Sequence, residues 1–142
     1  MNQRSGTTVL VNGINHIALI SKDVDRLRTF YMEVFDADAG PTTPHGKGGG
    51  ETMTVIRIGP HTELNVFTIE GNREPDRQTP MWGRGRLDHF GLQAASEESF
   101  EMIRQRLIKR GASDGHVNDF GGMRSIFFRD TDGLEGEVLI GK

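Results

Sequence analysis

The chain has 142 residues and a formal net charge of −3, and 35% of its residues are hydrophobic. This length suits one compact domain, and the charge provides no basic field that would attract nucleic acid. The apolar runs are shorter than the roughly 20 residues of a membrane-spanning helix, and the first residues lack the apolar centre of a signal peptide. The absence of cysteine excludes disulfides, thiolate metal ligands and a cysteine nucleophile, and it agrees with a cytoplasmic location.

The first predicted elements are a strand and a helix. The apolar run from Ile14 to Ile20 is typical of a strand, although it contains His16. Ser21 or Asp23 can cap the helix that follows, and Gly40 lies beyond its end. Gaps of three and four residues place the apolar side chains on one helical face: Val24, Leu27, Phe30, Tyr31, Val34 and Phe35.

Two β-rich segments, 52–59 and 62–71, follow this helix. The segment 72–86 is polar and rich in Pro and Gly, and it is predicted to be a linker. The stretch DHFGL, 88–92, then resembles the first strand in having a histidine, His89, within an apolar run.

The second half repeats the order of the first. Ser96 can cap a helix with an apolar face of Phe100, Ile103 and Leu107, and Gly111 is suited to its C-terminal end. Two more β-rich segments, 123–130 and 135–141, complete the half. We therefore expect one domain, 1–142, built from module one at about 13–71, a linker at 72–86 and module two at about 87–141.

Each module carries one histidine in its first predicted strand and one glutamate in its last. Glu63 follows His16 by 47 residues (63 − 16), and Glu137 follows His89 by 48 residues (137 − 89). Hydrophobic patterning alone does not require this recurrence. Two imidazoles and two carboxylates suit a borderline divalent metal ion, with Zn, Ni, Co, Fe and Mn all open.

Other residues compete for these positions. A single histidine in a strand is more often a hydrogen-bonded core residue than a metal ligand, and a single glutamate there is usually solvated. Because side chains alternate along a strand, His61 and Asn65 share the face of Glu63, and Glu135 shares the face of Glu137. The sequence leaves these alternatives open.

Three stretches resemble the vicinal oxygen chelate superfamily, which includes glyoxalase I, methylmalonyl-CoA epimerase, extradiol dioxygenases and the fosfomycin and bleomycin resistance proteins. They are INHIALISKDVDRLRTFY, LDHFGLQAASEESFEMIRQRL and FFRDTDGLEGEVL. The family ends in Asp-Pro-Asp-Gly, three residues and a metal glutamate. Here Thr131 replaces the proline and Leu134 the frequent asparagine, and the spacing from Asp130 selects Glu137 over Glu135.

The resemblance implies an α+β glyoxalase-like fold. Its two tandem βαβββ modules would form a curved, open, mixed sheet around a central metal cavity. The implied metal ligands are His16, Glu63, His89 and Glu137. The implied partners are a small-molecule substrate with vicinal oxygens and a second copy of the chain, and neither nucleic acid nor a membrane is expected.

Two histidines with two glutamates resemble glyoxalase I and the epimerases, so we expect a metal-dependent lyase or isomerase. Such enzymes act through a metal-chelated enediolate or enolate, with Glu63 or Glu137 as the catalytic base.

Two alternatives remain. The first is an extradiol-type ring-cleaving dioxygenase, for which His45, His61 and His116 are unassigned; Tyr31, the only tyrosine, is expected in the core. The second is a non-catalytic protein that binds a drug or metabolite. Three arginines, each more simply explained as a solvated surface residue, could hold an anionic substrate: Arg84, Arg86 and Arg124.

Overall fold

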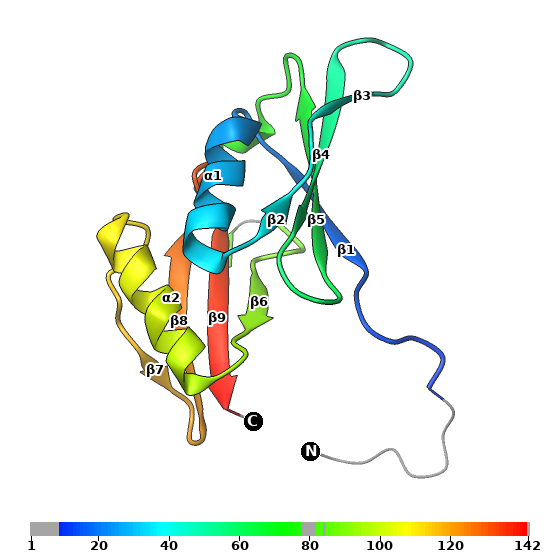
Figure 1. Cartoon of the computed structure of the whole chain (residues 1–142). Helices are drawn as coiled ribbons and strands as arrows, with labels where there is room; N and C mark the ends of the chain where they lie inside the picture. The colour runs from blue at the N-terminus through cyan, green and yellow to red at the C-terminus, as the bar shows by residue number, and fades with distance from the viewer. Residues whose placement is uncertain (1–8, 78–81, 84, 142) are drawn as a thin grey trace.

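The computed structural model describes residues 9–77, 82–83 and 85–141 (Figure 1). Module one contains β1 (His16–Ile20), α1 (Val24–Phe35), β2 (Asp38–Ala39), β3 (Thr43–His45), β4 (Glu51–Arg57) and β5 (Glu63–Ile69). Module two contains β6 (Phe90–Gln93), α2 (Glu97–Lys109), β7 (Asn118–Asp119), β8 (Met123–Arg129) and β9 (Glu135–Gly141). Between them, the predicted linker contains the short 3-10 helix η1 (Glu74–Asp76), and its positions 78–81 and 84 lie outside the described residues.

Each module forms its own hydrogen-bonded sheet. The strand order is β1-β5-β4-β2 in module one, where β3 also pairs with β4, and β6-β9-β8-β7 in module two. In both, the first strand runs parallel to the last, and the other pairs are antiparallel. The α+β fold and the mixed βαβββ modules are thus confirmed. No strand pairing joins the two sheets among the residues that the structure describes.

The helices begin at polar caps. Asp23, rather than Ser21, caps α1, because its side chain accepts a hydrogen bond from the backbone N–H of Arg26. Ser96 caps α2 in the same way, as predicted, by accepting from the N–H of Ser99. With 12 and 13 residues, α1 and α2 do not reach across a bilayer, and neither does any other helix of the described ranges.

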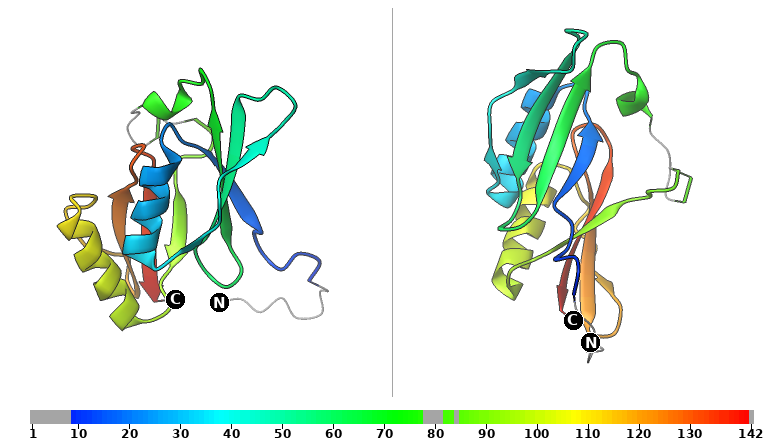
Figure 2. Two further views of the ribbon diagram at one scale, coloured as in Figure 1. Left: turned by 45° about the horizontal axis from the view of Figure 1, so that its top comes forward. Right: turned by 90° about the vertical axis from the view of Figure 1, so that its right-hand side faces the viewer.

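The apolar faces of the two helices and the two sheets form one core. Tyr31, Val34, Leu64 and Val138 are completely buried in it. The helices lie side by side, each on its own sheet, and no other α-helix of the described residues covers the opposite face of either sheet (Figures 1 and 2). His16 and Ala18 are exposed on that opposite face of module one.

Polar contacts also join the modules. The Ser21 hydroxyl donates to Asp132 Oδ2 at 2.7 Å, and the backbone N–H of Lys22 donates to the other oxygen of the same carboxylate at 3.1 Å. Arg106 of α2 donates to the Val34 carbonyl and to the Asp36 carboxylate at the end of α1. These contacts fix how the two modules pack.

Candidate metal centre

In module two, His89 and Glu137 come together across neighbouring strands. His89 precedes the first residue of β6, one position outside the strand in which it was predicted. Its Nδ1–H donates to Asp88 Oδ1 at 2.7 Å, and its Nε2 lies 3.3 Å from Glu137 Oε2. Glu135 lies two residues before Glu137 on β9, and its Cα partner on β8 is Arg129.

In module one, His16 is oriented in the same way. It is the first residue of β1, and its Nδ1–H donates to Asn15 Oδ1 at 2.8 Å. In both modules, therefore, the side chain before the histidine accepts a hydrogen bond from Nδ1–H, and the lone pair of Nε2 is available to bind a ligand. This supporting role was missed in the sequence, although the polar residues before His16 and His89 are visible there.

Glu63 lies directly beside His16, because the two are Cα partners in the parallel pairing of β1 and β5. Its carboxylate accepts from Arg57 Nη2 at 3.1 Å, and no hydrogen bond joins it to His16 among the described contacts. The structure thus brings His16 and Glu63 near each other in module one, and His89 and Glu137 near each other in module two.

The two pairs do not converge within one chain. In the described part of the chain, no group of three or more His, Cys, Asp or Glu side chains is placed to hold a metal ion. The four-ligand set of His16, Glu63, His89 and Glu137 therefore remains a prediction.

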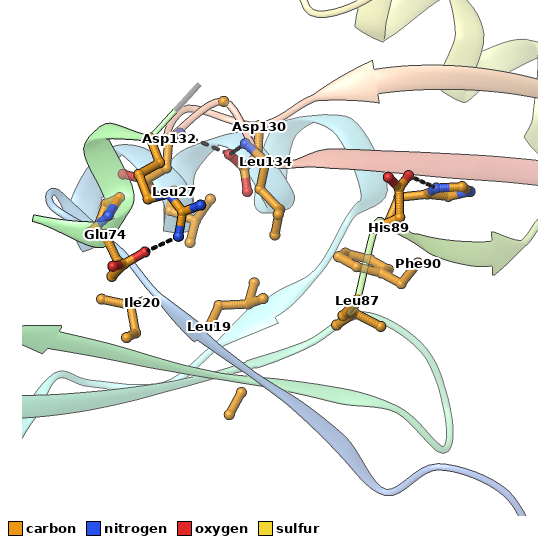
Figure 3. A pocket seen from close by; sticks show the side chains of 15 residues that line it. Leu19, Ile20, Leu27, Glu74, Leu87, His89, Phe90, Asp130, Asp132 and Leu134 are labelled. Carbon is orange, nitrogen blue, oxygen red and sulfur yellow. Dashed lines mark hydrogen bonds and ion pairs between the residues drawn. The ribbon is translucent and has the colours of Figure 1, made fainter. Parts of the chain in front are cut away.

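A cavity of about 260 Å³ lies between the modules (Figure 3). It is bordered by the end of β1, by η1, by the segment leading into β6 and by the turn between β8 and β9. Its lining includes Leu19, Leu27, His89, Phe90, Asp130 and Leu134. His89 reaches this cavity, whereas His16, Glu63 and Glu137 are not among its lining residues.

Residues 13–138 match the family described as the Glyoxalase/Bleomycin resistance protein/Dioxygenase superfamily. This match covers most of the chain. The chain belongs to that superfamily. No curated protein shows significant similarity to it.

Solved structures of this superfamily share the fold. A glyoxylase/bleomycin resistance protein/dioxygenase domain from Frankia sp. EAN1pec has a TM-score of 0.77 at 20% identity, covering 93% of this chain and 99% of its own. A point mutant of a fosfomycin resistance protein, FosX, from Listeria monocytogenes, in complex with Mn(II) and 1S,2S-dihydroxypropylphosphonic acid, has a TM-score of 0.67 at 20% identity, covering 94% of this chain and 95% of its own. Lactoylglutathione lyase from Agrobacterium tumefaciens has a TM-score of 0.64 at 22% identity, covering 94% and 96%.

The pair formed by His89 and Glu137 has donor atoms that suit a divalent metal ion. Because Asp88 accepts from Nδ1–H, the Nε2 lone pair faces a carboxylate oxygen 3.3 Å away. Two such acceptors repel each other unless the ring is protonated or a cation lies between them. Two donors bound to one metal at about 2.1 Å are themselves about 3.0–3.4 Å apart, so the observed separation suits a shared ion.

The buried turn before β9 holds the carboxyl group of Asp130, which the sequence marked only as the start of the closing motif. Burial raises the pKa of Asp130 from 3.8 to about 6, although the N–H groups of Asp132 and Leu134 donate to it and favour its ionised form. The hydroxyl of Tyr31 is also buried, and burial together with the charges of Asp130 and Asp132 raises its pKa.

Asp130→Asn should change the pH dependence of folding. The folded wild-type chain binds the proton of the Asp130 carboxyl more tightly than the unfolded chain does. This proton therefore stabilises the fold below pH 3.8, and its contribution is lost as the pH rises through 6. Asparagine keeps an oxygen for both N–H donors and does not ionise. Relative to wild type, the free energy of unfolding of the variant should therefore rise by about 2 kcal/mol between pH 4 and pH 7. Urea titrations across that range test this, and a constant difference between the two proteins would contradict it.

The remaining predicted candidates lie away from the centre. His61 and His116 are exposed, and the ring of His45, at the end of β3, packs against Phe67 at 5.1 Å. Arg124 forms an ion pair with Glu97 at the start of α2. Arg86 is exposed, and Arg84 lies outside the described residues.

Proposed function

We propose that the chain is a metal-dependent lyase or isomerase that acts on a small molecule with vicinal oxygens. The observation that carries this proposal is the Nε2 of His89 facing the carboxylate of Glu137, with Nδ1 fixed by Asp88. Fixing the second ring nitrogen in this way is typical of metal-binding histidines. His16, held similarly by Asn15, would supply the imidazole of module one.

A divalent ion held by these residues would polarise a carbonyl oxygen of the substrate as a Lewis acid. The step left to the protein is proton transfer. The Glu137 carboxylate would accept a proton from the carbon beside that carbonyl and return it to the product. The aromatic ring of Phe127, which is the Cα partner of Glu137 on β8, has its centroid 5.3 Å from that of His89 and would limit the access of bulk water to this carboxylate.

We further propose that two copies of the chain complete the centre. Module one would supply His16 and module two would supply His89, from sheets between which no strand pairing occurs in the described part of the chain. Both β1 and β6 are edge strands, and apolar side chains beside them, such as Ile14, Ile20 and Leu87, are exposed. A two-fold dimer that sets module one of each copy against module two of the other would form two equivalent centres.

The sole tyrosine weighs against the ring-cleaving alternative. Tyr31 is completely buried in the core beside Phe30 and Phe35, so no tyrosine side chain is placed beside His89. A binding protein without metal is distinguished from the enzyme by metal content.

Elemental analysis of the purified chain tests the proposal. We expect about one divalent ion per chain from a medium that contains Mn, Ni and Zn, and loss of that ion from His89→Ala. Light scattering should give the mass of a dimer. A metal-free protein that also fails to bind any of the three added ions would refute the proposed function.

A further inference from the structure

The internal repeat identifies which residues of the two modules occupy equivalent positions. Ser21 and Ala94 each follow their module's histidine by five residues. The N–H of Ser21 donates to the Phe67 carbonyl at 2.9 Å, and the N–H of Ala94 donates to the Leu139 carbonyl at 2.8 Å. Phe67 of β5 is therefore the counterpart of Leu139 of β9.

Counting back two residues from this pair gives the counterpart of Glu137. It is Asn65, not Glu63. The parallel register agrees, because Ala18 pairs with Asn65 in module one and Gly91 pairs with Glu137 in module two. Ala18 and Gly91 are themselves equivalent, since each follows its histidine by two residues.

The antiparallel registers lead to the same assignment. Glu63 is the Cα partner of Arg57, and Glu135 is the Cα partner of Arg129. Glu63 is thus the counterpart of Glu135, and both lie opposite an arginine. The 3.1 Å ion pair with Arg57 gives Glu63 a structural role that needs no metal.

A small residue lies beside each of these positions, Ala18 beside Asn65 and Gly91 beside Glu137. A Cβ atom added at Gly91 would lie 2.8 Å from Leu139 Cδ1 and, at an ordinary contact distance, 3.9 Å from Glu137 Oε2. The amide oxygen of Asn65, beside Ala18, is buried and has no hydrogen-bond partner among the described residues. A buried acceptor without a partner requires an explanation, and a cation bound to it is one.

We propose that Asn65, and not Glu63, is the module-one residue of the metal centre, alongside His16. This inference rests on the proposed function and changes its chemistry in two ways. An amide does not accept a proton, so Glu137 is the base of the centre. With one carboxylate in place of two, a divalent ion keeps a net charge of +1, which favours a substrate that chelates through an anionic oxygen.

Titration of the full chain with Mn(II), followed by the electron paramagnetic resonance signal of the free ion, tests this assignment. Asn65→Leu should weaken Mn(II) binding about 10-fold or more, the range seen when residues around a metal are lost. Asn65→Asp, which adds a carboxylate, should tighten it by a similar factor. Glu63→Gln should change the affinity less than about threefold. Thermal melts of each variant without metal confirm folding.

The outcomes separate this inference from the function on which it rests. A loss of about 10-fold or more in Glu63→Gln, with Asn65→Asp unchanged, would overturn the inference and leave the metal enzyme standing. Wild type that binds no Mn(II) would refute both. Oxalate binding tests the net charge of the centre. Oxalate should bind the Mn(II)-loaded wild type several-fold more tightly than the loaded Asn65→Asp variant, and equal affinities would contradict the effect of charge on substrate binding.

Discussion

Glu137→Ala should weaken Mn(II) binding at least about 10-fold and up to about 100-fold. The substitution removes the carboxylate that lies 3.3 Å from His89 Nε2, and with it the negative charge that balances the ion. Its backbone position on β9 is retained, so the sheet and the buried side chain of Val138 should be unaffected. Calorimetric titration of the purified variant with Mn(II) measures the loss.

Glu135→Ala is the matched control. It removes the same carboxylate from the same strand two residues earlier, opposite Arg129. We expect its Mn(II) affinity to stay within about threefold of wild type. If Glu135→Ala lost more affinity than Glu137→Ala, the wrong glutamate would have been assigned to the centre.

Phe128→Ala should lower the free energy of unfolding by about 3–5 kcal/mol. Phe128 is 2% exposed on β8, and its ring lies 5.9 Å from that of Phe30 and 5.4 Å from that of Phe35, both on α1. Gly136 on β9 leaves the space that this ring fills, since a Cβ atom there would lie 2.3 Å from Phe128 Cζ. The truncation therefore empties a packed site between the modules.

Urea unfolding followed by circular dichroism measures this loss. Phe120→Ala, at a position 62% exposed, is the control and should change the free energy of unfolding by less than about 0.5 kcal/mol. A loss below about 1 kcal/mol for Phe128→Ala would show that the two modules do not depend on this contact.

The local structure was predictable because its causes are local. The three- and four-residue spacing of apolar side chains defines both helices, and Ser96 and Gly111 mark the ends of α2, where Gly111 adopts a φ of +68°. The segments 123–130 and 135–141 predicted β8 and β9 almost residue for residue. The resemblance implied a further short strand in each module, but β2, β3 and β7 could not be located in the sequence, because two or three residues carry no readable alternation.

The register of the last strand in each module was not predictable from spacing. The nearly equal separations of 47 and 48 residues suggested that Glu63 and Glu137 are equivalent. The connections between histidine and glutamate differ in length between the modules, and backbone hydrogen bonds rather than residue counts set the register. As a result, Asn65 lies where module two has Glu137.

The relation between the modules also depends on tertiary packing. The Ser21–Asp132 hydrogen bond and the contact of Phe30 with Phe128 join residues about a hundred positions apart in the chain. No pattern along the sequence specifies such contacts. The sequence could therefore suggest both histidines as ligands without showing that they do not meet within one chain.

A centre shared between two chains is tested most directly by a mixed dimer. Chains carrying His16→Ala or His89→Ala would be co-expressed with two different affinity tags, neither of them polyhistidine, and the mixed dimer isolated by both tags in turn. Each variant alone should bind Mn(II) at least about 10-fold more weakly than wild type. In the mixed dimer, one centre would lack both histidines and the other would keep both. We expect it to bind about half as much Mn(II) as wild type, at wild-type affinity. A mixed dimer that bound Mn(II) as weakly as either variant alone would show that no centre combines module one of one copy with module two of the other.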